Sequence, residues 1–175
     1  LILYTLTATF AAYDWMMSLE PEWFSSIYGV IFMAGQAVVT LAFVIILARW
    51  LEKREPLSQW LSIPVFNDLG NFLMAFIAFW AYVSFSQYLI IYQSNLPETV
   101  TWYITRTQGG WQWIALILIF FHFVLPFVIL LARRVKRNER LLTGVAIYMF
   151  FMHGLDLFWL VMPAFYKDGF SIHWL

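Results

Sequence analysis

The chain of 175 residues is 63% hydrophobic and only 11% charged, and its formal net charge is zero. Water-soluble domains carry about a quarter charged residues, so this composition excludes an ordinary soluble protein. A neutral chain gives no reason to expect a nucleic-acid partner. The absence of cysteine excludes disulfides and iron–sulfur clusters ligated by this chain.

The apolar residues fall into blocks of roughly 20, the length that crosses about 30 Å of hydrocarbon as a helix. A membrane β-barrel would instead require alternating segments of about ten residues, and the sequence has none. We therefore expect an all-α integral membrane protein, specifically a transmembrane four-helix bundle that is a fragment of a larger polytopic subunit. Membrane lipids are then its immediate partners.

The expected elements begin with residues 1–12, an apolar run that we interpret as the end of a preceding transmembrane helix. Residues 13–24 contain acidic side chains but no Lys or Arg, and form a periplasmic connection. The bundle occupies residues 25–163. Its four spans are expected at about 25–48, 68–93, 110–132 and 141–163. Residues 164–175 form a periplasmic-side tail, after which we expect the chain to continue.

Basic residues set the expected orientation of the bundle. Loop 49–60 contains three Lys or Arg residues and loop 133–140 contains five, whereas the loop at 95–110 has only Arg106. Loops with few and loops with many basic residues alternate along the chain, as the positive-inside rule requires for four crossings. The two basic loops should therefore face the cytoplasm.

Ionisable side chains in the middle of membrane spans are costly unless they are hydrated or partnered, so they mark candidate functional sites. His153 and Asp156 lie three residues apart on the last span, a spacing that places both on one helical face. His122 lies near the middle of the preceding span, and Gln36 on the first span falls at a similar depth. At 1.5 Å per residue, the histidines lie about 15 and 18 Å from the cytoplasmic ends of their helices.

Several chemistries fit this group of residues. A His–Asp pair can relay protons, because the carboxylate stabilises the protonated imidazole and fixes its tautomer. The same pair can hydrogen-bond a quinone carbonyl and exchange the proton released when the quinol is oxidised. His122 and His153 could also be the axial ligands of a b-type haem, although no glycine-rich helix face indicates room for a porphyrin. The remaining interpretation is interhelical hydrogen bonding that only stabilises the bundle.

A second set of polar residues lies on the span at 68–93. Ser84, Gln87 and Tyr88 are in its outer part and could continue a hydrated path from the mid-membrane residues toward the outer face. Asp68 lies at the cytoplasmic end of the span. Helix capping is its ordinary role there, and proton entry is the sharper hypothesis.

Pro126 lies four residues after His122. Because proline has no backbone N–H, it removes the amide that would bond the His122 carbonyl. This predicts a kink that frees the carbonyl for water or a polar partner. Kinking without function is the simpler interpretation.

The most distinctive stretch of the chain is residues 8–36, which read ATFAAYDWMMSLEPEWFSSIYGVIFMAGQ. Two acid–aromatic clusters flank a proline turn and lead into a helix start. This stretch resembles the corresponding segment of the F subunits of bacterial alternative complex III, a quinol:cytochrome c oxidoreductase. These subunits belong with the polysulfide-reductase membrane-subunit (NrfD-like) proteins. The likeness extends over the whole chain, including His122 and the His153-Gly154-Leu155-Asp156 segment.

The resemblance implies a multi-pass subunit of the bacterial inner membrane, in which the four spans form the second of two four-helix bundles. Its implied partners are the iron–sulfur subunit, the multihaem cytochrome c subunits, a related C-type membrane subunit that holds the main quinol site, and a terminal oxidase. Haem c and iron–sulfur clusters would reside in those partners. The chain itself would bind no cofactor or metal, with menaquinone or another quinone left open, and would not be active alone.

The leading interpretation is therefore a membrane subunit of a respiratory quinol:cytochrome c oxidoreductase. Its buried polar groups would move protons, His153 and Asp156 first and His122 next. The alternative is a purely structural scaffold that docks the catalytic subunits, and the third interpretation is a b-type haem protein.

Overall fold

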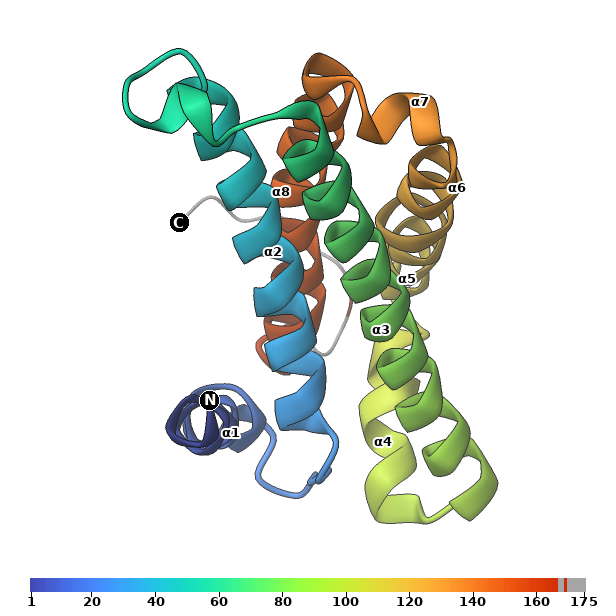
Figure 1. The fold of residues 1–175 in the computed structure, drawn as a ribbon. Coiled ribbons are helices and arrows are strands. Elements are labelled where there is room, and N and C mark those ends of the chain that lie inside the picture. The colour runs from blue at the N-terminus through green and yellow to red at the C-terminus, as the bar shows by residue number, and fades with distance from the viewer. Residues whose placement is uncertain (167–168, 170–175) are drawn as a thin grey trace.

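The computed structural model describes residues 1–166 and 169 and consists of helices joined by short connections (Figure 1). Four helical spans are long and apolar enough to cross a membrane. The expected all-α membrane bundle is confirmed, and no strand occurs within the described residues. The spans are α2 (Tyr28–Leu51), α3 (Ile63–Ser94), the continuous α5–η3–α6 (Trp111–Ile117, Leu118–Val124, Leu125–Leu131), and α8 (Glu139–Val161) with η4 (Met162–Ala164).

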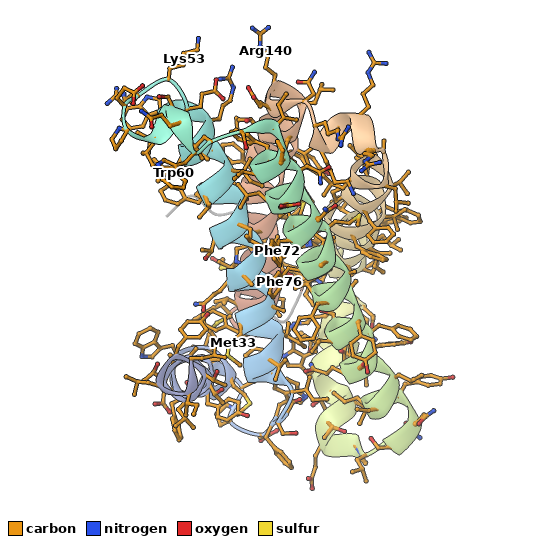
Figure 2. The ribbon with its side chains drawn as sticks, in the orientation of Figure 1. Met33, Lys53, Trp60, Phe72, Phe76 and Arg140 are labelled. Carbon is orange, nitrogen blue, oxygen red and sulfur yellow. The ribbon has the colours of Figure 1, made fainter. Side chains whose placement is uncertain are left out.

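The outer surface of the bundle carries many large apolar side chains. Between 28% and 33% of the residues in the most apolar part of each span are buried, so most of these side chains are at least partly exposed. Phe72, labelled in Figure 2, is 58% exposed. Contiguous apolar surface on this scale is unfavourable in water and is what hydrocarbon solvates.

Helix α2 lies at the centre of the packing, against both α3 and α8. Its buried face repeats every three or four residues through Ala34, Val38, Ala42 and Ile45, all of them 0–1% exposed. The two alanines let neighbouring helix backbones approach closely, which is how membrane helices gain packing energy without a hydrophobic driving force between them.

The two ends of the bundle differ. Lys53 and Arg140, from the two basic loops, lie at the same end (Figure 2). This end also carries α7 (Arg133–Lys136), and we call it the α7 end. The opposite end carries α4 (Pro97–Arg106), where α2 begins and α3 ends, and we call it the α4 end.

The connections contain more helix than expected. Helix α4 occupies most of the expected loop 95–110, and Pro97 in its first turn is favourable because that N–H needs no helical partner. Helix α3 begins at Ile63 rather than near 68. Ser62 precedes it in extended backbone and Pro64 lies in its first turn. Asp68 therefore lies inside the helix instead of capping it. A short helical turn, η2 (Leu57–Gln59), interrupts the basic loop 49–60.

Helix α1 (Ile2–Trp15) is oriented differently from the spans. Figure 1 shows it nearly end-on while the long helices run up the view, so α1 crosses the bundle near the start of α2. The end of a preceding span would be expected to run along the bundle instead. Thr9 packs directly on Gly29, where an added Cβ would meet Thr9 Cγ2 at 3.0 Å. After η1 (Met17–Leu19), the connection returns to α2. Of the expected tail 164–175, residues 167–168 and 170–175 lie outside the described residues.

Candidate functional site: a buried His–Asp cluster and an adjoining cavity

His122, His153 and Asp156 converge in the middle of the bundle, and we call them the His–Asp cluster. One ligand atom of each lies within 4.8 Å of those of the other two. All three are buried, with exposed fractions of 0%, 6% and 3%. The same-face spacing of His153 and Asp156 brings His153 Nδ1 to 3.6 Å from Asp156 Oδ2, slightly beyond hydrogen-bond distance. The structure thus brings together three of the four candidate residues that the sequence singled out near the middle of the spans.

Trp80 on α3 completes the surroundings of the cluster. Its indole Nε1 donates a 3.2 Å hydrogen bond to Asp156 Oδ2. Its ring centroid lies 4.2 Å from that of His122. Trp80 therefore orients the carboxylate and packs on one imidazole at the same time. From the sequence, packing or a lipid-facing position is the main expectation for this residue, with a place in an aromatic quinone or haem pocket as the alternative.

His122 lies on η3, a segment in π-helical conformation. The Leu125 N–H bonds the Phe120 carbonyl five residues back, so the register here is one residue wider than in an α-helix. In this register the carbonyl that loses its partner to Pro126 is that of Phe121, not His122. The Tyr148 hydroxyl donates to the Phe121 carbonyl at 2.7 Å. Proline thus frees a carbonyl, as expected, but one residue earlier, and a side chain of α8 satisfies it.

Both ring nitrogens of His122 are buried without a hydrogen-bond partner among the described residues, and so is His153 Nδ1. An imidazole always carries at least one N–H donor. Burying such a group without a partner costs about 1–3 kcal/mol. Buried polar groups without a partner are uncommon in folded proteins, and at membrane depth ionisable ones mark a candidate functional site.

The fourth residue expected at this depth, Gln36, points away from the cluster. Its Oε1 accepts a 2.7 Å hydrogen bond from the Tyr4 hydroxyl of α1. Its neighbour Gly35 faces the cluster instead, and an added Cβ there would lie 2.6 Å from His153 Cε1. Consecutive helical residues are about 100° apart, so one of the two necessarily turns away. Gly35 was not singled out in the sequence.

A cavity of about 440 Å³ adjoins the cluster on the side of the α4 end. Its deep wall includes Trp80 and Asp156, and its far wall includes Trp102, Tyr103 and Arg106 of α4. We call it the α4-end cavity. Ser84, Gln87 and Tyr88, the expected secondary path, all line it, whereas Asp68 is exposed and lies outside it. The cavity therefore connects three of the four secondary candidates to the cluster.

Arg106 is the main functional residue that sequence reasoning missed. It is 1% exposed, and its Nη2 bridges Glu20 Oε1 at 2.8 Å and donates to the Leu160 carbonyl at 2.8 Å. Its guanidinium carbon stacks 3.7 Å from the Trp102 ring centroid. Burial lowers the Arg106 pKa, and the Glu20 carboxylate acts in the opposite direction. The only available signal was a single arginine in an otherwise base-free loop.

Tyr103 lies beside Arg106 on the cavity wall. Burial raises the pKa of its phenol well above the ordinary value, although the Gln87 amide and the Arg106 charge act in the opposite direction. The hydroxyl is therefore neutral throughout the physiological pH range, able to donate one hydrogen bond and accept others.

The cluster could also ligate a metal, since His nitrogen and carboxylate oxygen are zinc ligands. Around one tetrahedral zinc the ligand atoms would lie about 3.3 Å apart, as follows from metal–ligand bonds of 2.0–2.1 Å. The three ligand atoms, which lie within 4.8 Å of one another, would therefore have to move closer together to bind zinc. Trp80 packs on the His122 ring and the Gly35 backbone packs on the His153 ring, so both imidazoles are held between neighbouring helices.

A scan against protein-family models finds no match for this chain, and a search of curated proteins finds none either.

Proposed function

We propose that this protein is a proton-handling membrane subunit of a respiratory quinol:cytochrome c oxidoreductase of the alternative complex III type, in the bacterial inner membrane. The observation that carries the proposal is the His–Asp cluster, in which three buried titratable groups from two helices converge within 4.8 Å. A redox complex that oxidises a quinol releases protons, and such clusters accept and pass protons within a membrane.

Proton transfer within the cluster needs only small movements. The 3.6 Å separation of His153 Nδ1 and Asp156 Oδ2 closes to a hydrogen bond with a slight side-chain rotation. Both ring nitrogens of His122 are unpartnered, so the imidazole can accept a proton on one nitrogen and donate one from the other. The Trp80 indole keeps one Asp156 oxygen in place during these exchanges.

The position of the cavity supports exchange with the α4 end. Asp156 lies on its wall, so protons would enter or leave the cluster from the α4 end. Near the α7 end the buried Lys136 donates a hydrogen bond to Asn71, and between this pair and the cluster Leu73 and Met149 are fully buried apolar side chains. We therefore assign Asp68 no part in the relay. If the basic loops face the cytoplasm, the α4 end faces the periplasm, the side on which quinol oxidation would release protons.

The alternative function is a structural scaffold that docks the catalytic subunits. The Trp80–Asp156 hydrogen bond supports it, because this contact ties α3 to α8 in the bundle core. The two functions differ in the effect of Asp156→Asn. A scaffold loses assembled complex but keeps turnover per complex, whereas a relay assembles normally and loses proton release. The packing of Trp80 and Gly35 on the two imidazoles argues against the haem interpretation.

The membership of such a complex is tested by affinity purification of the tagged protein from its native membrane. We expect haem c subunits and an iron–sulfur subunit to co-purify, with quinol:cytochrome c activity in the eluate. A reduced-minus-oxidised spectrum without a c-type haem band, together with no quinol oxidation, would contradict the proposed complex.

A further inference from the structure

An apolar groove lies on the outside of the bundle between α6 and α8, and we call it the α6–α8 groove. It encloses about 260 Å³, and its walls include Pro126 and Ile129 of α6 and Leu141 and Gly144 of α8. The one polar side chain on its walls, Tyr148, already donates its hydroxyl to a backbone carbonyl. An occupant of the groove therefore meets no side chain that still needs a hydrogen bond.

The absence of a side chain at Gly144 keeps the groove open. An added Cβ there would have no atom within 4 Å, so no neighbouring residue fills the space. Leu125 and Leu141 on its walls are 40% and 48% exposed, which places the groove on the surface that hydrocarbon solvates. The walls of an unfilled gap lose dispersion contacts, and a flexible acyl chain of the bilayer restores them.

The connection between α6 and α8 carries several cations at the α7 end of the groove. Four of its basic side chains are exposed: Arg133, Arg134, Arg137 and Arg140. None of the four makes an ion pair with another residue in the part of the chain that the structure describes. The fifth, Lys136, is buried and donates to Asn71 instead. The four guanidinium groups are therefore available to an anionic partner.

The groove leads from these arginines toward the membrane interior. Arg140 precedes Gly144 by four residues, so both lie on one face of α8, with Arg140 a turn nearer the α7 end. From Leu141 to Tyr148 the helix rises about 10 Å. Figure 2 shows Arg140 at the end of the bundle, which is the headgroup level for a span of this length. The groove thus has the layout of a lipid, with charge at the headgroup level and hydrocarbon below it.

The other basic loop differs from this arrangement. Loop 49–60 combines three basic with two acidic residues, whereas residues 133–140 combine five with one. In loop 49–60, Arg49 pairs with Glu52, and Arg54 stacks on the Trp50 ring at 4.1 Å from its centroid. Both loops satisfy the positive-inside rule. Residues 133–140 in addition leave several cations unpaired beside an apolar groove.

We propose that the α6–α8 groove binds an acyl chain of an anionic phospholipid, whose headgroup phosphate lies on the exposed arginines of residues 133–140. Guanidinium groups bind phosphate oxygens in bidentate pairs, and each basic residue at the membrane surface adds attraction for anionic lipids. A zwitterionic lipid has the same chains and phosphate, but the arginines repel its cationic headgroup. Net headgroup charge therefore decides which lipid binds. Binding of the lipid requires no proton transfer, so this proposal does not depend on the proposed function.

The test is lipid retention by the purified protein, together with whatever subunits accompany it. Delipidated samples in detergent are incubated with equal amounts of dioleoylphosphatidylglycerol and dioleoylphosphatidylcholine, passed through gel filtration and analysed by mass spectrometry. Gly144→Leu fills the groove. Gly154→Leu is its matched control, since Gly154 lies on the same helix outside the groove and an added Cβ there also has no atom within 4 Å. Arg140→Gln removes one cation, and Arg54→Gln in the other basic loop is its control.

We expect the wild type and both controls to retain more phosphatidylglycerol than phosphatidylcholine. Arg140→Gln should retain about fivefold less phosphatidylglycerol than the wild type, the factor for one basic residue at an anionic surface. Gly144→Leu should retain several-fold less than Gly154→Leu, and Arg140→Gln keeps the test decisive if Gly144→Leu does not fold.

Equal retention of the two lipids by the wild type overturns the proposal, as does equal retention of phosphatidylglycerol by wild type, Gly144→Leu and Arg140→Gln. Loss of an accompanying subunit from Gly144→Leu, with unchanged retention of phosphatidylglycerol, also overturns it, because a protein segment would then occupy the groove.

Discussion

Gly35 should be the position at which a single methyl group most directly disturbs the His–Asp cluster. An added Cβ would lie 2.6 Å from His153 Cε1 and 3.2 Å from its Nδ1. Carbon atoms in contact are normally about 3.5–4.0 Å apart. His153 is 6% exposed and enclosed by its neighbours, so its ring has little room to retreat.

The expected magnitude combines two opposing effects. Replacing glycine by alanine inside a helix stabilises it by about 1 kcal/mol. Overpacking a well-filled core costs about 1–3 kcal/mol. Gly35→Ala should therefore have a free energy of unfolding equal to or up to about 2 kcal/mol below that of the wild type. Gly144 and Gly154 have nothing within 4 Å of an added Cβ. Their alanine variants should gain up to about 1 kcal/mol.

The measurement is unfolding of the purified protein in mixed micelles, by increasing the fraction of denaturing detergent and following helicity by circular dichroism. Gly35→Ala is predicted to unfold earlier than Gly144→Ala by about 1–3 kcal/mol. If the two variants unfold at the same detergent fraction, the close approach of α2 to His153 is not a feature of the folded protein. The geometry of the cluster would then have to be revised.

Three further predictions use the same unfolding measurement. Arg106→Met removes two hydrogen bonds to backbone carbonyls and the ion pair with Glu20, so it should lower the free energy of unfolding by about 2–4 kcal/mol. Glu20→Gln should lower it less, because that carboxylate is partly exposed. Equal losses in the two variants would contradict the role of Arg106 as a buried cation. Tyr148→Phe should lower the free energy of unfolding by about 1 kcal/mol in the wild type. The loss should be much smaller in Pro126→Ala, because the restored backbone N–H can bond the Phe121 carbonyl in place of the hydroxyl. Additive effects of the two substitutions would refute the role of the hydroxyl. Trp80→Phe should cost about 2 kcal/mol, because the cluster carboxylate loses its indole donor, and no change would mean that this hydrogen bond is not formed.

The fold could be predicted from the sequence because span length and hydrophobicity are enough to count membrane helices. The residues at which helices begin were harder to predict. Asn67 and Asp68 have cap chemistry, but Ser62 and Pro64 offer an earlier start, and α3 uses it. Helix α4 was missed because its ten residues include Glu98, Arg106 and three threonines, so that hydropathy treats this connection as a loop.

The candidate site could be predicted only in part. The three-residue spacing of His153 and Asp156 fixes their common face on any helix, so their proximity needed no structure. The proximity of His122 depends on how its helix rotates about its axis, and the π-helical register there has no signal beyond Pro126. The depth of Gln36 in the membrane did not predict whether it joins the cluster, because the rotation of α2 about its axis directs Gly35 toward His153 instead.

The α4-end cavity shows the same limit. Its walls come from segments separated by tens of residues, including an arginine whose partner, Glu20, lies on the far side of two spans in the sequence. Positive-inside counting treated Arg106 as a topology signal. Arg106 is buried by its packing against Trp102 and Trp159, which no local sequence pattern predicts.

The central claim is that the His–Asp cluster carries protons released by quinol oxidation. The most direct measurement is the number of protons released per electron by the purified complex in proteoliposomes, followed with a pH-sensitive dye during quinol-driven cytochrome c reduction. The account predicts that Asp156→Asn assembles with the wild-type subunit composition but releases fewer protons per electron. Asp14→Asn, at an exposed position before α2, should match the wild type. An unchanged proton-to-electron ratio in a fully assembled Asp156→Asn complex would contradict the account.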